Sequence, residues 1–173
     1  MAGNVPGNAK TVPAQLRMFA NAGLDPRCVG PKYANFFALN YDPAAKMAAQ
    51  YGTDPALPLG LSAFESGWAK SRMMQEQNNP HGATPDGAKG VSYPSVPAAW
   101  ESWGRQWGPR IQGAGEDAPL FIQKLQEDNR QKPNAVNRRG AYNSAHPAQW
   151  AKGVADGVIG VRRRLADWRK YGC

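Results

Sequence analysis

One acidic side chain stands in an apolar segment that has the periodicity of a helix. In LSAFESGWAKS, residues 61–71, a helix turning about 100° per residue gathers the apolar side chains on one stripe. That stripe consists of Leu57, Leu61, Phe64 and Trp68. The opposite, exposed arc consists of Ser62, Ser66 and Lys70. Glu65 borders the apolar stripe, where burial raises the pKa of a carboxyl group. A general acid needs such a raised pKa, so Glu65 is a candidate for that role, with a structural glutamate at a helix edge, paired with an arginine, as the alternative.

The other residues with reactive or metal-binding side chains are few. The chain has two cysteines, Cys28 and Cys173, and two histidines, His81 and His146. The cysteines have neither a C-x-x-C nor a zinc-type spacing. Two histidines are too few for the usual ligand sets or for a Cys–His nucleophile pair to be expected. The sequence therefore predicts no metal site and no cofactor.

Turn signals divide the first half of the chain into short helices. Thr11 to Pro13 indicates a helix start, and Asp42 with Pro43 and Asp54 with Pro55 each combine an N-cap with a proline in the first turn. Gly52 is expected to end the helix between these two pairs. Residues 78–97, NNPHGATPDGAKGVSYPSVP, are so rich in glycine and proline that they can form only a loop or a small hairpin.

Three helical patterns follow in the second half of the chain. Tryptophans at i, i+3 and i+7 are interpreted as core residues: Trp100, Trp103 and Trp107. Residues 120–129 form the next pattern, and Pro147 opens the last helix. Its apolar stripe comprises Trp150, Val154, Val158, Val161, Leu165 and Trp168. Beside that stripe lie Gly153, Gly157 and Gly160. Each glycine costs about 1 kcal/mol of helix propensity relative to alanine, so close packing on a neighbouring element is expected.

Composition indicates one globular domain, residues 1–173, that is mostly helical with a small β lobe. The chain is 42% apolar, and its apolar runs are far shorter than the ~20 residues that span a bilayer, so no membrane insertion is expected. The first ten residues, MAGNVPGNAK, lack the features of a secretory signal. A net charge of +8 suits a polyanionic partner, although the cluster of Arg162, Arg163 and Arg164 is interpreted as a solvated helical face.

Four segments together resemble glycoside hydrolase family 73, the bacterial β-N-acetylglucosaminidases of the lysozyme superfamily. AFESGWAKS, residues 63–71, resembles the family's catalytic-helix motif, and NNPHG, residues 78–82, resembles the asparagine-rich segment that follows it. YPS, residues 93–95, resembles the Tyr-x-Ser after the β lobe, and AYNSAHP, residues 141–147, resembles the late tyrosine segment. The segments occur in the family's order within about residues 55–168, after N-terminal helices in residues 1–54.

The resemblance implies a lysozyme-like helical domain in which Glu65 donates a proton to the leaving oxygen of a glycosidic bond. Aromatic rings cover sugar faces and amides bond acetamido groups, so Asn79, Tyr93 and Tyr142 are the expected substrate-binding residues, with His81 a weaker candidate. The chain departs from the family at His81, where phenylalanine is usual. It also lacks the acidic residue of the run that ends at Pro147.

The second catalytic role stays open at the level of sequence. Asp86, in a shortened lobe, could activate a water and invert the anomeric centre. Alternatively, the N-acetyl group of the substrate could attack and retain that configuration. Pro-Asp-Gly is also ordinary turn chemistry, which gives Asp86 a purely structural interpretation.

A small basic domain without a signal peptide resembles the type VI secretion glycoside hydrolase effectors. This resemblance implies synthesis in the cytoplasm, export by secretion machinery and attack on peptidoglycan in a rival's periplasm. It also implies an immunity protein that blocks the active site. In the oxidising periplasm, Cys28 and Cys173 are expected to form a disulfide, with two free thiols as the alternative.

Four other functions remain open. A phage endolysin fits the missing signal, and a lytic transglycosylase would use the same lone glutamate. A non-catalytic wall-binding module would keep the aromatic residues and would be indifferent to the loss of Glu65. A nucleic-acid binder would use the arginines, but the sequence has no helix-turn-helix or RNA-binding signature, so no nucleic-acid partner is expected.

Overall fold

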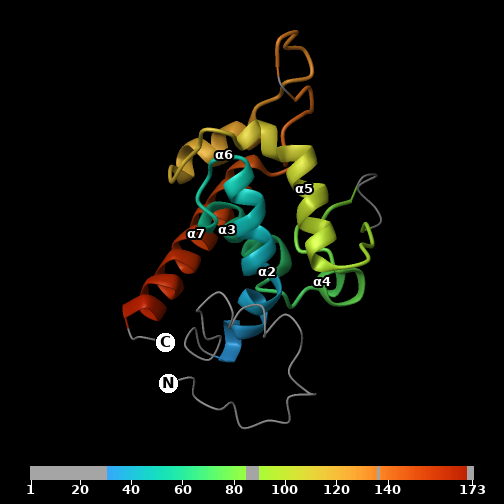
Figure 1. Ribbon diagram of the computed structural model, residues 1–173. Coiled ribbons are helices and arrows are strands. Elements are labelled where there is room, and N and C mark those ends of the chain that lie inside the picture. The colour runs from blue at the N-terminus through green and yellow to red at the C-terminus, as the bar shows by residue number, and fades with distance from the viewer. Residues whose placement is uncertain (1–30, 85–89, 136, 171–173) are drawn as a thin grey trace.

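The computed structural model describes residues 31–84, 90–135 and 137–170, and these residues form a mostly helical structure (Figure 1). The helices, in chain order, are α2 (Pro31–Gln50), α3 (Ala56–Ser66), α4 (Arg72–Gln77), α5 (Val96–Ile111), α6 (Ala118–Gln126) and α7 (Pro147–Lys170). Within the described residues, β pairing is confined to an isolated bridge between Thr53 and Gly115. The predicted mostly α fold is confirmed.

For residues 78–97 the sequence predicted a loop or a small hairpin, and the part of this segment that the structure describes is a loop, without the small β lobe. Residues 78–84 and 90–95 form turns and coil without a strand. Their backbones are joined to the rest of this region by isolated hydrogen bonds, from Val91 N–H to the Ala83 carbonyl at 2.9 Å and from Tyr93 N–H to the Gln77 carbonyl at 2.8 Å. A ladder needs a regular succession of such bonds, which a segment so rich in proline and glycine does not supply.

Helix α3 lies at the centre of the fold and is buried on nearly every side. The predicted exposed arc is therefore wrong at two positions, because Ser62 and Ser66 are fully buried. Their hydroxyl groups are satisfied inside the protein: Ser62 donates to the Pro80 carbonyl at 3.0 Å and Ser66 to the Ser62 carbonyl at 2.7 Å. Phe64, predicted to be on the buried stripe, is instead 40% exposed.

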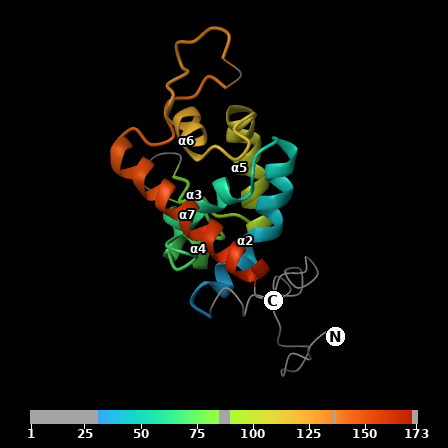
Figure 2. The same ribbon diagram turned by 90° about the vertical axis from the view of Figure 1, so that its left-hand side faces the viewer.

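Helix α7 crosses α3 at close range through glycines (Figure 2). A Cβ on Gly60 would lie 2.6 Å from Val158 Cα, and a Cβ on Gly157 would overlap the Gly60 carbonyl oxygen. Gly153 faces the Phe64 ring in the same way. The close packing predicted for the glycines of α7 is confirmed, and it fixes the helix that carries Glu65 against the last helix of the chain.

The predicted helix boundaries are partly confirmed. Asp54 precedes α3 and accepts a hydrogen bond from the Ala56 N–H at 2.7 Å, as an N-terminal cap does. By contrast, α2 runs through Asp42 and Pro43, so the helix start predicted there is wrong. Proline removes one backbone bond, but buried residues on both sides of Pro43 anchor α2 to the core and offset that loss. The start predicted at residues 11–13 lies outside the described residues.

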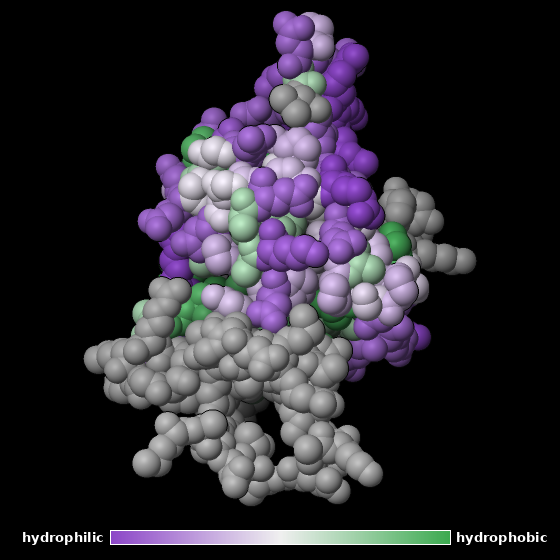
Figure 3. All heavy atoms as spheres, viewed as in Figure 1, coloured by the Kyte–Doolittle hydropathy of each residue, from purple (hydrophilic) through white to green (hydrophobic). Residues whose placement is uncertain are grey.

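In the second half of the chain, the buried residues follow the apolar pattern predicted from the sequence. Trp100 and Trp103 of α5 are buried, and the Trp100 Nε1–H donates to Asn40 Oδ1 at 2.9 Å. Helix α7 begins at Pro147 as predicted. The segment between α6 and α7 projects from the body in Figures 1 and 2, and it is mainly hydrophilic in Figure 3. Among the described helices, none is both long and apolar enough to cross a membrane.

Candidate active site

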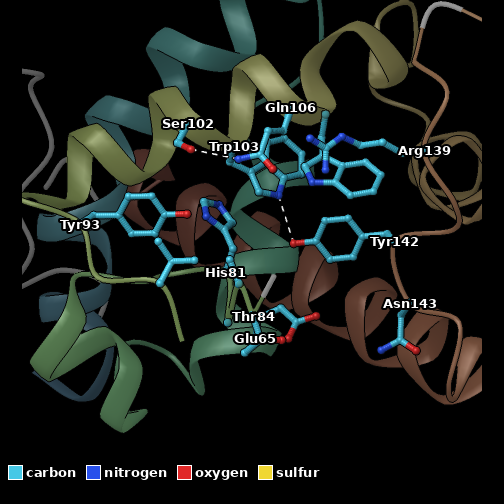
Figure 4. A pocket seen from close by; sticks show the side chains of 14 residues that line it. Glu65, His81, Thr84, Tyr93, Ser102, Trp103, Gln106, Arg139, Tyr142 and Asn143 are labelled. Atoms are coloured by element: carbon cyan, nitrogen blue, oxygen red, sulfur yellow. Dashed lines mark hydrogen bonds between the residues drawn. The ribbon is translucent and has the colours of Figure 1, made fainter. Parts of the chain in front are cut away.

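A cleft of about 650 Å³ opens beside the C-terminal end of α3 (Figure 4). Helix α5 forms one wall, the loop after α4 forms another, and the segment that precedes α7 closes one end. Four residues predicted from the sequence line this cleft: Glu65, His81, Tyr93 and Tyr142. They come from three separate parts of the chain, so the fold brings the predicted motifs together.

Glu65 is held in one orientation by the last helix. The Trp150 Nε1–H donates to Glu65 Oε1 at 2.7 Å, and an indole N–H is a donor only. Oε1 is therefore an acceptor, and a proton on this carboxyl group resides on Oε2. Oε2 lies toward Gly82, where a Cβ would come within 3.3 Å of it. Gly82 has a φ of +60°, which favours glycine, so the backbone can approach the carboxyl group closely.

Burial raises the pKa of Glu65, as the helical wheel predicted. The hydrogen bond from Trp150 favours the ionised form and lowers the pKa by a smaller amount. Glu65 is also the penultimate residue of α3, where the negative end of the helix dipole disfavours a carboxylate. A carboxyl group with a raised pKa keeps its proton at higher pH, which is the state that a proton donor needs.

An unusual turn follows Ser66, the last residue of α3. Gly67, Trp68 and Ala69 have φ values of 56°, 59° and 67°, so two residues other than glycine adopt the left-handed conformation. Such residues cost of order 1–3 kcal/mol each. Trp68 packs edge-on against Tyr33 at 4.8 Å, and the Arg164 guanidinium lies 4.6 Å from the centroid of the Trp68 ring. These contacts hold the turn and thereby fix the point at which α3 ends. They also fix the position of Glu65 near that end.

His81 is an aromatic packing residue whose edge lines the cleft. Its ring stacks on Trp103 at 5.3 Å with an interplanar angle of 20°, and it meets Trp100 edge-on at 4.4 Å. Burial lowers the pKa of His81 to about 3, so the imidazole is neutral at ordinary pH. Its Nε2 has no hydrogen-bond partner among the described residues.

Tyr142 stands between the wall of α5 and the carboxyl group. Its hydroxyl oxygen accepts a hydrogen bond from the Trp103 Nε1–H at 3.1 Å, and its ring packs on Trp107 and Trp150 at 4.7 and 5.3 Å. Burial and the nearby Glu65 carboxylate raise the pKa of Tyr142 far above its usual value. The hydroxyl group therefore stays protonated, and among the described residues none accepts its proton.

Asn79 does not line the cleft. Its side chain is fully buried and spans the loop after α4. The Nδ2 donates to the carbonyls of Ala83 and Val91 at 3.0 and 3.1 Å, while Oδ1 accepts from the Ala83 N–H at 3.0 Å. Because its amide is fully used, Asn79 shapes the loop that carries His81 and Gly82, and the structure gives it no direct access to a ligand in the cleft.

Three predicted residues lie outside the described part of the chain: Asp86, Cys28 and Cys173. The second-carboxylate role of Asp86 and the disulfide both stay predictions. Within the described lining of the cleft, Glu65 is the one carboxylate. The described residues also contain no group of three or more histidine, cysteine or acidic side chains that could hold a metal ion.

Several residues of the candidate site, which line the cleft or contact Glu65, were not identified from the sequence. In the sequence, Trp150 is part of the apolar stripe of the last helix. No sequence pattern indicates a role in the site for its indole N–H. Trp103 and Trp107 were assigned to the core, but each also lines the cleft. Arg139 lines it too and comes from the segment between α6 and α7, where only its charge was noticeable.

Comparison with known proteins adds a likeness in fold. No protein-family model and no curated protein matches this chain. A chain in a solved structure superimposes with a TM-score of 0.60 at 23% sequence identity, covering 80% of this chain and 97% of that chain. That structure is a type VI secretion system effector–immunity complex from Pseudomonas protegens. At this identity the likeness concerns the fold alone.

Proposed function

We propose that this protein is a peptidoglycan glycoside hydrolase that cleaves the β-1,4 bond after N-acetylglucosamine in the bacterial wall. The observation that carries the proposal is Glu65: a half-buried carboxyl group with a raised pKa, oriented by Trp150, in a cleft of about 650 Å³. A protonated carboxyl group can give its proton to the leaving oxygen. The aromatic rings of Tyr93 and Trp107 offer apolar surfaces to sugar faces on the same cleft.

In this function Oε2 of Glu65 is the atom that delivers the proton. Trp150 occupies Oε1, and the close backbone at Gly82 leaves Oε2 on the side of the loop that lines the cleft. Tyr142 lies near enough to Glu65 for the carboxylate charge to raise its pKa. Its neutral hydroxyl can therefore donate a hydrogen bond to the carboxylate that forms after proton transfer, or to the substrate.

The proposed reaction also needs a group that stabilises the oxocarbenium-like centre. Asp86 could activate a water and invert the anomeric configuration, or the N-acetyl group of the substrate could attack and retain it. The configuration of the first-formed product, followed by proton NMR, separates these routes. Inversion together with a large loss of turnover in Asp86→Asn supports the water route, whereas retention with turnover within a few fold of wild type supports substrate assistance.

A lytic transglycosylase is the second candidate, because the described lining of the cleft has one carboxylate only. Such an enzyme uses a lone acid and leaves an anhydro sugar instead of a reducing end. Mass spectrometry of digested cell wall decides between the two, since hydrolysis adds the mass of one water. Products that carry reducing N-acetylglucosamine support the proposed hydrolase. Products that end in an anhydro sugar would contradict it and identify the protein as a lytic transglycosylase.

We further propose that the protein is an antibacterial effector exported by a type VI secretion system and neutralised by an immunity protein over the cleft. The fold is similar to a chain from an effector–immunity complex, and a cleft that contains a half-buried carboxyl group supports the effector role within such a pair. Directing the protein to the periplasm of a test bacterium should cause lysis, whereas retaining it in the cytoplasm should not. Equal toxicity in both compartments would argue against action on the wall.

A further inference from the structure

The segment between α6 and α7 brings a cation to the rim of the cleft. Arg139 is an exposed residue, and its guanidinium lies 5.7 Å from the centroid of the Trp107 ring. In Figure 4 it reaches over the end of the cleft opposite to Tyr93, beside Gln106. The two ends of the cleft therefore differ in charge.

The backbone at Arg139 is fixed to the body of the protein. The buried Arg110 donates from Nη1 to the Gly140 and Arg139 carbonyls at 2.8 and 3.4 Å, and the Asn129 N–H donates to the Arg139 carbonyl at 2.9 Å. The Arg139 N–H donates to Asn137 Oδ1 at 3.1 Å, and the Asn137 amide donates to a backbone carbonyl of α5. These bonds fix the backbone and thereby position the Arg139 side chain at the rim of the cleft. The side chain of an arginine on an unattached loop would not be positioned in this way.

The charge of Arg139 is not neutralised within the described part of the chain. The ion pairs found there use other cations: Arg72, Arg130, Lys132 and Lys152. Glu65 is uncharged when it acts as a proton donor, and His81 is neutral. Arg139 is then the one fixed charge in the described lining of the cleft, whose remaining residues are aromatic, apolar or neutral hydrogen-bonding groups.

We propose that Arg139 binds a carboxylate carried by the substrate and so selects peptidoglycan over uncharged glycans. This inference rests on the proposed function. Wall glycan alternates a neutral acetamido sugar with one whose lactyl ether carries either a free carboxylate or a peptide with its own carboxylates. Chitin has the same β-1,4 backbone without these acids. The planar guanidinium can pair with a carboxylate through two parallel hydrogen bonds, which gives both strength and a fixed register.

The test compares three substrates in the full-length protein: intact peptidoglycan, glycan strands freed of peptides by an amidase, and chitin oligomers. We expect Arg139→Gln to lose roughly ten- to hundredfold in kcat/KM on a carboxylate-bearing substrate, as loss of one charged hydrogen-bonded contact implies. The loss on chitin should be several-fold smaller. A loss confined to peptide-free strands identifies the free lactyl carboxylate, and a loss confined to intact wall identifies the carboxylates of the peptide. Equal losses on both show that Arg139 accepts either carboxylate.

Arg138→Gln is the matched control, because Arg138 is the exposed neighbour that does not line the cleft and whose Nη2 donates to the Arg130 carbonyl. It should retain wild-type rates on all three substrates, and Arg139→Lys should recover part of the loss. If Arg139→Gln matches wild type, or loses as much on chitin as on wall, the carboxylate site is refuted while the hydrolase stands. If the wild-type protein cleaves none of the three, the proposed function itself fails and this inference fails with it.

Discussion

At the scale of single residues, burial raises the pKa of Glu65, while the hydrogen bond from Trp150 orients the carboxyl group and opposes part of that rise. The indole donates to Oε1 and favours the ionised carboxylate, which lowers a pKa that burial has raised. In Trp150→Phe we expect the pKa of Glu65 to rise, because the bond is lost while an aromatic ring remains. The alkaline limb of the activity profile should move to higher pH, since the acid keeps its proton longer.

A profile of kcat/KM against pH measures this shift, and a circular dichroism spectrum checks that the variant is folded. The maximal rate should also fall, because Oε2 is no longer held toward Gly82. An alkaline limb that stays in place, in a folded variant, would show that Trp150 does not act on the proton donor.

His81 makes the stability of the protein depend on pH. Its pKa is about 3 in the folded protein against 6.5 for an exposed histidine, so between these values the unfolded state binds the extra proton. The contribution of His81 to stability is complete above pH 6.5 and is lost as the pH falls toward 3. In His81→Phe this loss is absent, while an aromatic ring still packs on Trp103.

We therefore expect the melting temperature of His81→Phe to fall less than that of wild type between pH 6.5 and 3. The exposed His146 offers a matched control, and His146→Gln should keep the wild-type dependence. Parallel curves for wild type and His81→Phe would contradict the burial of a neutral imidazole.

At the scale of secondary-structure elements, the crossing of α3 and α7 depends on glycine. A methyl group on Gly157 would meet the rigid backbone of Gly60, whereas one on Gly160 would meet side chains of Trp68 and Arg164 at 3.1–3.3 Å. We expect Gly157→Ala to be destabilised by about 1–3 kcal/mol, as in other overpacked cores. In a domain of this size that lowers the melting temperature by roughly 2–4 °C per kcal/mol.

Gly160→Ala is the control in the same helix. It gains about 1 kcal/mol of helix propensity and meets only side chains, which can move, so its melting temperature should stay near wild type. Thermal melts of the two variants settle the comparison. A Gly157→Ala variant as stable as Gly160→Ala would show that the two helices can separate at little cost.

The elements that the sequence predicted well are those whose signals are local. The apolar stripe of α7 and the capping residue Asp54 both depend on near neighbours along the chain. The start predicted at Pro43 failed because the tertiary contacts of α2 override a local breaker. Ser62 and Ser66 were placed on an exposed arc because a helical wheel assumes one solvent-facing side, which a central helix such as α3 does not have.

The residues of the candidate site also divide into those that local sequence predicts and those that it does not. Glu65 could be predicted, because an acid beside an apolar stripe is visible in eleven residues of sequence. Trp150 contacts Glu65 and Arg139 lines the cleft, although both lie more than 70 residues further along the chain, and nothing in their own neighbourhood in the sequence indicates this. The sequence predicts a binding role for Asn79, but it does not reveal the hydrogen bonds across the loop that use the Asn79 amide within the protein.

At the scale of the whole molecule, the fold is a helical scaffold that carries a carboxyl group on a central, immobilised helix and surrounds it with loops. Helices α5 and α7 supply the rings that orient or enclose Glu65, and the loops after α4 and α6 complete the cleft. The protein's net charge of +8 suits an anionic wall, and Arg139 places one of those charges at the cleft itself. This arrangement agrees with the proposed action on a long anionic glycan.

The central claim is that Glu65 is the proton donor for cleavage of wall glycan, and Glu65→Gln tests it most directly. The amide keeps the shape and can still accept the Trp150 hydrogen bond, but it cannot donate the catalytic proton. Purified wild type, Glu65→Gln and the exposed control Glu101→Gln are incubated with isolated peptidoglycan, and the released fragments are quantified by mass spectrometry. We expect Glu65→Gln to lose roughly a hundredfold or more of the wild-type rate, while Glu101→Gln retains it. Release of fragments by folded Glu65→Gln at the wild-type rate would contradict the claim.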